Sequence, residues 1–191
     1  MKKLISGLIL SSCTLMAIEP YNAFYITAGG GVDFTDSINT SSSTLTYEKP
    51  YHWFGAIGYQ FKNYKIEIEE IYTQADLYSV SEVKAIGDFT KSTQMLNAYY
   101  CAYNHSKMVL NLGVGGGISS TELTNMIQNN IHVSNIKDSN IATFNGIISL
   151  GYFISDHLST DIKYRYLYTL EGDNFDSFGQ NSLSFGLRID F

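Results

Sequence analysis

Seven charged side chains lie at alternate positions in three segments of the chain, and these residues have the types and spacing to act together. Carboxylates and cations that meet in a partly desolvated interior pair with each other, because an unpaired buried charge is costly. The pattern therefore predicts a network of ion pairs instead of a face of solvated charges. Its members are Glu67, Glu69, Asp161, Lys163, Arg165, Arg188 and Asp190.

Two kinds of behaviour are open to such a network. Glu67 and Glu69 could pair with Lys163, Arg165 or Arg188 as a static polar core, which is the simpler interpretation. If the pairs exchanged partners, they would instead act as the gate of a narrow pore. The two interpretations differ in the ionic conductance that they predict, and the sequence leaves both open.

Composition excludes several classes of protein. The 191 residues carry 12 Lys and Arg against 18 Asp and Glu, a formal net charge of −6, whereas a nucleic-acid binder needs clustered cations. The hydrophobic fraction of 45% argues against a disordered chain. No apolar run reaches the roughly 18 residues that a helical membrane span needs. The length is that of one domain.

No metal and no cofactor is expected. The four His residues are scattered along the chain without a nearby group of Cys or acidic residues, whereas metal sites gather several such ligands. Two glycine-rich stretches, 29–31 and 113–117, lack the Lys-Ser/Thr pair of a phosphate-binding loop. Glycine inside a strand leaves room for the close approach of bulky neighbours. We therefore expect both stretches to lie in strands.

The elements that must position the charges are strands. Apolar and polar residues alternate through most of the chain, and successive side chains of a strand point to opposite faces. Near the C-terminus every second residue from 183 to 191 is apolar, and the residues between them are polar or Gly. A tilted strand needs roughly 10 residues to cross a bilayer. The eight predicted strands are 24–34, 51–62, 64–73, 93–103, 108–118, 143–154, 161–168 and 181–191.

The connections between these strands alternate in length, as they do in an outer-membrane barrel. One strand face is apolar and the other carries the charges, which suits a wall between lipid and a polar lumen. We predict an all-β fold, an eight-stranded antiparallel up-and-down transmembrane β-barrel with four long extracellular loops and short periplasmic turns. A soluble eight-stranded barrel with a ligand cavity has the same period and is the alternative. The short connections are near Asn63, at 104–107 and at 155–157, and the long ones are 35–50, 74–92, 119–140 and 169–180.

Glu70 breaks the pattern of its strand. If Ile66 and Ile68 face lipid, strict alternation also places the Glu70 carboxylate there, at a cost of about a few kcal/mol. We expect a bulge or register change near 69–70 that returns Ile71 to the lipid face. The alternative is that Glu70 lies in the outer interface of the membrane.

The N-terminal segment has the pattern of a secretory signal peptide, because two Lys residues precede an apolar stretch at 4–10 and small residues follow. We expect residues 1–17 to be removed by cleavage after Ala17 and residues 18–191 to form the barrel domain. The sequence Leu-Ser-Ser-Cys that ends at Cys13 resembles a lipoprotein box. Cleavage before Cys13 with acylation of its thiol is therefore the alternative.

With these features the sequence resembles the small bacterial outer-membrane β-barrel family, which includes the Opa-like surface antigens and the barrel of outer membrane protein A. The resemblance covers 18–191 and implies a Gram-negative outer-membrane location in contact with outer-membrane lipid. In this family the terminal aromatic residue belongs to a signal that the barrel-assembly machinery reads, so the resemblance gives that role to Phe191. The matching segments are 24–34, Asn97-Ala-Tyr-Tyr100, 111–117, Lys163-Tyr-Arg-Tyr166 and 184–191.

The resemblance implies a structural or surface-interaction role, adhesin-like or antigen-like, in which the long loops contact a host or surface ligand. A narrow gated pore is one alternative. An outer-membrane lipid-modifying enzyme is another, since lipid A deacylases are barrels with a His-x-Ser pair and His157-Leu-Ser159 has that spacing. This pair falls at a predicted periplasmic turn, however, and we expect no enzymatic activity.

Overall fold

A computed structural model describes residues 22–34, 37–40, 43–80, 83–128, 131–132 and 135–191 of the chain. The predicted signal peptide 1–17, with Cys13 and Ala17, lies outside the described residues. The described chain contains no helix long and apolar enough to cross a membrane. Its strands are β1 (Ala23–Phe34), β2 (Ser37–Thr40), β3 (Ser43–Phe61), β4 (Tyr64–Val80), β5 (Val83–His105), β6 (Met108–Gln128), β7 (Ile131–His132), β8 (Ile136–Phe153), β9 (Leu158–Thr169) and β10 (Phe178–Asp190).

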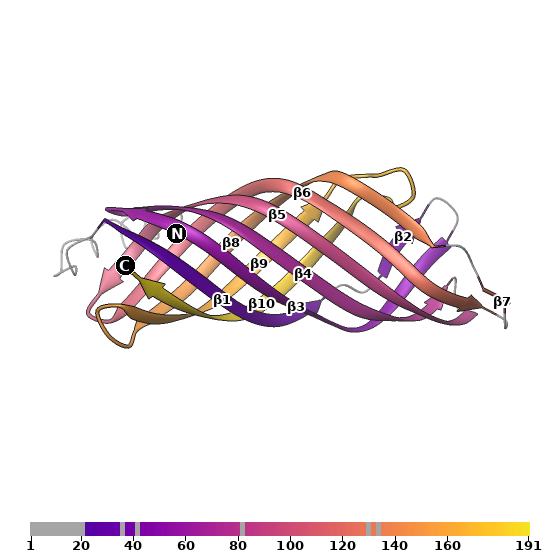
Figure 1. Ribbon diagram of the computed structural model, residues 1–191, viewed down its shortest axis with the longest axis horizontal. Coiled ribbons are helices and arrows are strands. Elements are labelled where there is room, and N and C mark those ends of the chain that lie inside the picture. The colour runs from indigo at the N-terminus through magenta and orange to yellow at the C-terminus, as the bar shows by residue number, and fades with distance from the viewer. Residues whose placement is uncertain (1–21, 35–36, 41–42, 81–82, 129–130, 133–134) are drawn as a thin grey trace, which may run out of the picture.

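Eight long antiparallel strands close into a barrel, because β1 pairs with β10 on one side and with β3 on the other (Figure 1). The two short strands, β2 and β7, pair only with the ends of β3 and β6. Apart from them, each strand pairs with the next along the chain. The predicted eight-stranded up-and-down barrel is confirmed.

Tight turns join the strands at one end of the barrel. Lys62 and Asn63 connect β3 to β4, and Ser106 and Lys107 connect β5 to β6. The first residue of each turn adopts a left-handed backbone, with φ of 50° at Lys62 and 56° at Ser106. Strand β1 begins and β10 ends at this same end (Figure 1). Because the number of strands is even, the start of the first strand and the end of the last strand lie on the same side. In an outer-membrane barrel this is the periplasmic side.

The part of the barrel next to the tight turns has an apolar outside and a polar inside. Ile57, Ile68 and Val114 point outward and are 66%, 70% and 68% exposed, whereas Arg165 points inward and is 0% exposed. Aromatic pairs mark two levels of this wall. Tyr64 and Tyr100 meet near the turns at a centroid distance of 5.5 Å, and Trp53 stacks on Tyr72 higher up at 4.9 Å. Tyr and Trp prefer the two membrane interfaces, so the wall between these pairs faces lipid.

Beyond the Trp53–Tyr72 pair the polarity of the wall inverts. Strands β5 and β6 have 23 and 21 residues, about twice the roughly 10 that cross a bilayer. Much of the four long connections predicted as loops is therefore strand. We call the described residues of 37–50, 74–92, 119–142 and 169–180 the outer extension. Its interior is an apolar cluster of Ile38, Leu45, Tyr47, Ala75, Leu77, Val80, Ala85, Phe89, Leu123, Met126, Phe175 and Phe178.

The bulge predicted near 69–70 does not occur, and that prediction is wrong. Glu70 pairs with Gly55 and Ile71 pairs with Phe54, without a shift of register. Ile71 consequently points into the lumen and is 3% exposed, while Glu70 points outward. The strand can keep its alternation because Gly55 leaves space beside the carboxylate and the Ser92 hydroxyl donates a hydrogen bond to Glu70 Oε1 at 2.5 Å.

Glycines on the lumen side make room for the rings of neighbouring strands. A Cβ on Gly113 would lie 2.5 Å from the Tyr99 ring, and a Cβ on Gly31 would lie 2.8 Å from the His52 ring. Neither side chain could keep its position beside an alanine. The two glycine-rich stretches lie in β1 and β6 and accommodate bulky neighbours, in agreement with the structural interpretation of their sequence.

Candidate functional site

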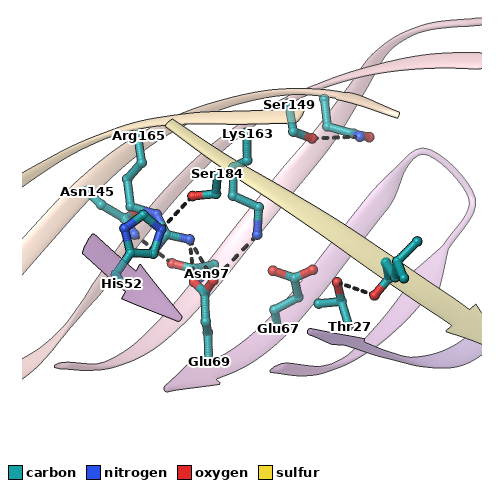
Figure 2. Close-up of polar contacts among 12 residues, drawn as sticks. Thr27, His52, Glu67, Glu69, Asn97, Asn145, Ser149, Lys163, Arg165 and Ser184 are labelled. Atoms are coloured by element: carbon teal, nitrogen blue, oxygen red, sulfur yellow. Dashed lines mark hydrogen bonds and ion pairs between the residues drawn. The ribbon is translucent and has the colours of Figure 1, made fainter. Parts of the chain in front are cut away.

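The centre of the lumen is built around the Glu69 carboxylate on β4, which is 1% exposed. Figure 2 shows Lys163 and Arg165, both on β9, pointing across the lumen toward it. Arg165 Nη2 donates to Glu69 Oε1 at 2.6 Å and to Oε2 at 2.7 Å, and Lys163 Nζ donates to Oε1 at 3.4 Å. The fold thus brings three of the seven predicted residues into one group, from strands nearly a hundred residues apart in sequence.

Two asparagines complete this group. Asn97 Nδ2 on β5 donates to Glu69 Oε2 at 2.6 Å, and Asn145 Nδ2 on β8 donates to Asn97 Oδ1 at 3.0 Å. Side chains from four strands, β4, β5, β8 and β9, therefore tie the wall together across the lumen. From the sequence, Asn97 was identified only within a segment that carries the family resemblance, and neither asparagine was assigned to the charge network.

A second group lies nearer the tight turns. Arg188 donates to Asp190 Oδ1 through Nε at 2.8 Å and through Nη2, and its Nη2 also donates to Gln60 Oε1 at 2.9 Å. The guanidinium lies over the Tyr25 ring, 3.7 Å from its centroid, and the Tyr25 hydroxyl donates to Glu67 Oε1 at 3.0 Å. Glu67 therefore pairs with a phenol, whereas Glu69 takes the two cations of β9.

Asp161 stands apart from both groups. It lines a polar cavity of about 30 Å³ between them, together with Lys65, Glu67, Asn111 and other side chains. Such a space holds roughly two water molecules. Glu67 Oε2 and Asn111 Oδ1 have no hydrogen-bond partner within the protein, so both oxygens are placed to accept a hydrogen bond from water there. The structure gives Asp161 the setting of a hydrated lumen carboxylate.

A Ser–His–Asp arrangement that the sequence did not reveal lies on the side of the central group away from the tight turns. His52 Nε2 lies 2.8 Å from Ser184 Oγ, and His52 Nδ1 lies 2.8 Å from Asp33 Oδ1. This order of atoms resembles a hydrolase triad. The three residues are 3%, 3% and 5% exposed, however, so a substrate has no access to the hydroxyl. The arrangement instead links β3 to β10 across Gly31 of β1, which lies between them.

Lys91 is a further lumen cation that sequence reasoning missed, because it lies in a segment predicted as a loop. Its Nζ donates to Thr169 Oγ1 at 2.8 Å and to Gln180 Oε1 at 3.4 Å. The ammonium also lies 4.8 Å from the centroid of the Phe178 ring. It is 1% exposed, and it marks the boundary between the polar lumen and the apolar cluster.

The segment between β9 and β10 folds over the outer end of the lumen. Asp138 Oδ2 accepts hydrogen bonds from the backbone N–H of Asn174 at 2.9 Å and of Phe175 at 3.0 Å. The Asn174 side chain donates to the other oxygen at 2.5 Å. These bonds hold Phe175, which is 1% exposed, inside the apolar cluster. The outer end is therefore closed by apolar side chains, and the middle is closed by the Glu69 group.

We expect Asp138→Ala to lower the free energy of unfolding by about 1–2 kcal/mol, because two backbone N–H groups and one amide lose a charged acceptor. The segment 170–177 should then be cut faster by a protease added to the purified barrel. Ser139→Ala, an exposed neighbour, is the matched control. Equal cleavage rates in the two variants would show that Asp138 does not anchor the segment.

The His-x-Ser spacing of the enzyme alternative does not form an assembled pair in the structure. His157 is exposed in the turn between β8 and β9, whereas Ser159 points into the lumen and is 6% exposed. No hydrogen bond joins these two side chains, both of which are described. Among the described residues no group of three His, Cys, Asp or Glu side chains is placed to hold a metal ion.

Comparisons with known proteins agree with this architecture. No protein-family model matches the chain, and no curated protein matches it. Neisserial surface protein A matches with a TM-score of 0.66 and 17% identity, over 88% of this chain and 97% of that one. The attachment invasion locus protein Ail of Yersinia pestis, in complex with the heparin analogue sucrose octasulfate, matches with a TM-score of 0.57 and 14% identity, over 89% and 99%. Ail without this ligand gives 0.52 and 13%, over 89% and 99%.

At sequence identities this low, the matches show only that the folds are similar. This similarity agrees with the closed ring of eight strands, the apolar outer wall and the tight turns at one end. The chain therefore has the fold of the small bacterial outer-membrane β-barrels.

Proposed function

We propose that this barrel resides in the bacterial outer membrane and acts at the cell surface through its outer extension, as an adhesin-like or antigen-like protein. The observation that carries the proposal is the inversion of polarity along the strands. Between the tight turns and the Trp53–Tyr72 pair the outer wall is apolar, as a surface in contact with lipid must be. On the other side of that pair the same strands enclose a buried apolar cluster. A folded body held beyond the membrane by continuous strands is a suitable platform for contact with other molecules.

The closed lumen supports surface interaction over conduction. The Glu69 group fills the middle of the barrel, and Phe175 with its apolar neighbours fills the outer end. Eight strands leave an interior that side chains just fill. Nothing in the described lumen favours a gate, so the narrow pore is not proposed as a second function.

Cysteine labelling on intact cells tests the location and orientation. Asp88 is exposed on the outer extension, and Asp156 is exposed in a turn at the opposite end. In a Cys101→Ser background, a membrane-impermeant maleimide should label Asp88→Cys on whole cells and should label Asp156→Cys only after lysis. Labelling of both variants on intact cells, or of neither, would overturn the proposal.

The charge of the chain limits the kind of surface partner. The four long connections hold ten Asp and Glu residues and four Lys residues, a formal charge of −6 that equals the charge of the whole chain. Among the acids whose side chains the structure describes, Asp76, Asp88, Glu171 and Asp173 are exposed. Ail has been solved with a polyanionic heparin analogue. The opposite charge preference is expected here, because a surface of one sign repels ligands of the same sign.

We therefore expect the purified barrel to pass through a heparin column at low salt and to bind beads that carry poly-lysine. Binding to poly-lysine should weaken as salt is added, since screening reduces contacts between exposed charges. A variant with Asp76→Asn and Asp88→Asn should bind more weakly, and one with Asp156→Asn, at the periplasmic end, should bind as the wild type does. Retention on heparin would show that charge does not select the partner.

The C-terminus supports the proposed contact with the barrel-assembly machinery. Phe191 is 72% exposed, and its backbone N–H donates to the Phe24 carbonyl at 2.9 Å. Strand β10, which closes the barrel, is thus followed directly by an aromatic side chain that is not packed inside. We propose that Phe191 is read during assembly, when the pairing of β1 with β10 has still to form.

A further inference from the structure

A hollow lies in the outer wall beside Glu70. It has a volume of about 550 Å³, and its lining includes Ile26, Gly55, Ile57, Ile68, Glu70 and Gln94. A side chain on Gly55 would meet nothing within 4 Å, so the floor of the hollow is open. Ile57 and Ile68 are 66% and 70% exposed and flank the floor on the side of the tight turns. The hollow is an apolar groove with one carboxylate at its edge.

The hollow lies at the upper edge of the lipid-facing wall. Gly55 and Glu70 form one cross-strand pair of β3 and β4, and the outward-facing pair that follows is Trp53 with Tyr72. Two residues along a strand span about 6.6 Å. Stacked Trp and Tyr rings belong at the membrane interface. The Glu70 carboxylate therefore lies just on the membrane side of that interface, where lipid head groups meet acyl chains.

The charge of Glu70 is only partly satisfied by the protein. The Ser92 hydroxyl donates one hydrogen bond to it, at 2.5 Å. Among the described side chains, the exposed cations are Lys62 and Lys107 in the tight turns and Lys137 in the outer extension, so none faces outward within the lipid-facing wall. An ionised carboxylate beside lipid is costly in free energy unless a hydrogen-bond donor or a cation approaches it.

This distribution of charge decides between two occupants of the hollow. A second copy of the chain, docked symmetrically, would bring another Glu70 and no cation, and like charges at an interface repel. A lipid whose head group carries a primary amine brings three N–H donors and a positive charge, together with an apolar chain. The lipid matches both the carboxylate and the groove below it.

We propose that the hollow binds an amine-bearing membrane lipid, with its ammonium group on Glu70 and an acyl chain over Gly55 between Ile57 and Ile68. This site lies outside the outer extension and is separate from the proposed surface interaction. It shares with that proposal only the placement of the barrel in a membrane. It also gives a physical role to the residue that breaks the apolar pattern of β4.

The chain contains a natural reporter for the site, because its single Trp residue is Trp53. Lipids with brominated acyl chains quench Trp fluorescence on contact. The purified barrel is reconstituted into phosphatidylcholine vesicles that contain a minor fraction of brominated phosphatidylethanolamine or of brominated phosphatidylglycerol. We expect the amine-bearing lipid to be enriched at Trp53 by about 2- to 5-fold over the anionic lipid, the range that a partly exposed ion pair supplies.

Two variants and one control assign the effect. Glu70→Gln should abolish the preference for the amine-bearing lipid, and Gly55→Leu should reduce contact with it by filling the hollow. Glu122→Gln, which removes a carboxylate from the outer extension, should keep the preference. Equal quenching by the two lipids in the wild type, or an unchanged preference in Glu70→Gln, would overturn the proposal.

Two further outcomes would overturn it for different reasons. If Trp53 is shielded from both brominated lipids and cross-linking detects a dimer, the hollow is filled by a second copy of the chain. If no brominated lipid quenches Trp53 in a monomer, the placement in the membrane is itself wrong, and the proposed function fails with it. Equal quenching by both lipids leaves the membrane placement intact, so the two failures are distinguishable.

Discussion

Replacing Glu69 by Leu should lower the free energy of unfolding by about 3–5 kcal/mol, because it leaves two buried cations without their counter-charge. Arg165 and Lys163 are 0% and 3% exposed, so water cannot take the place of the carboxylate without opening the lumen. Asn97 would also lose the acceptor of its 2.6 Å hydrogen bond. The loss is measured by urea titration of the refolded barrel in detergent, followed by the fluorescence of Trp53.

Two companion variants separate the ion pair from other effects of the substitution. Glu70→Leu removes the adjacent carboxylate, which faces outward, and should not lower the stability. The double variant Glu69→Leu with Arg165→Leu should recover part of the loss, because an apolar pair of similar volume often replaces a buried ion pair without cost. A stable Glu69→Leu single variant would show that the Glu69 group contributes nothing.

The same variant distinguishes the two interpretations of the lumen charges. If the network is a static core, Glu69→Leu destabilises the barrel, and the folded fraction still blocks ions through Phe175 and the apolar cluster. If the pairs are a gate, breaking them produces steady conductance across a planar bilayer. The fixed geometry favours the static core, because Arg165 contacts both oxygens of Glu69 at 2.6 and 2.7 Å.

The fold was predictable from sequence because a barrel wall imposes a period of two on every strand that crosses the membrane. The alternation assigned Glu69, Lys163 and Arg165 to one face. It could not tell which carboxylate meets which cation, because Glu67 and Glu69 lie on the same face of one strand. The partners depend on the offset between strands after the ring has closed, and this offset is a property of the whole barrel.

The ends of the strands were harder to predict because the apolar side chains change from the outer face of the strand to the inner face along its length. Within the membrane the apolar side chains point outward, as Ile68 does. In the outer extension they point inward, as Leu77 and Phe89 do, each 4% exposed. A pattern that moves from one face to the other resembles an interrupted strand. Lys91 was missed for this reason, since its segment was assigned to a loop although it continues β5.

Glu70 shows a different limit of sequence reasoning. The prediction of a bulge assumed that every outward position of β4 must be apolar. The structure instead keeps the register and places the carboxylate between Gly55 and the Ser92 hydroxyl. Gly55 and Ser92 lie on other strands and are separated from Glu70 by 15 and 22 residues in sequence. The residues next to Glu70 therefore contained no sign of these partners. An outward charge near the interface is tolerated when neighbouring strands supply space and a donor.

Gly29→Ala adds a single methyl group and should lower the free energy of unfolding by about 2–3 kcal/mol. A Cβ at this position would lie 2.8 Å from Gly186 Cα and would collide with the Phe185 carbonyl, both on β10. Those atoms belong to the backbone of the strand that closes the barrel, so no rotamer change relieves the contact. Phe54, whose ring would lie 2.8 Å from the same methyl, would also have to move.

Gly55→Ala is the matched control, because this glycine is on the neighbouring strand and its added methyl meets nothing within 4 Å. Its free energy of unfolding should stay within about 0.5 kcal/mol of the wild type. Both variants are compared by urea titration and by the shift in gel mobility between unboiled and boiled samples. If the two unfold at the same urea concentration, β1 and β10 do not approach as closely as described. If only Gly29→Ala loses stability, the small residues of β1 are what allow side chains of β3 to reach β10 and close the barrel.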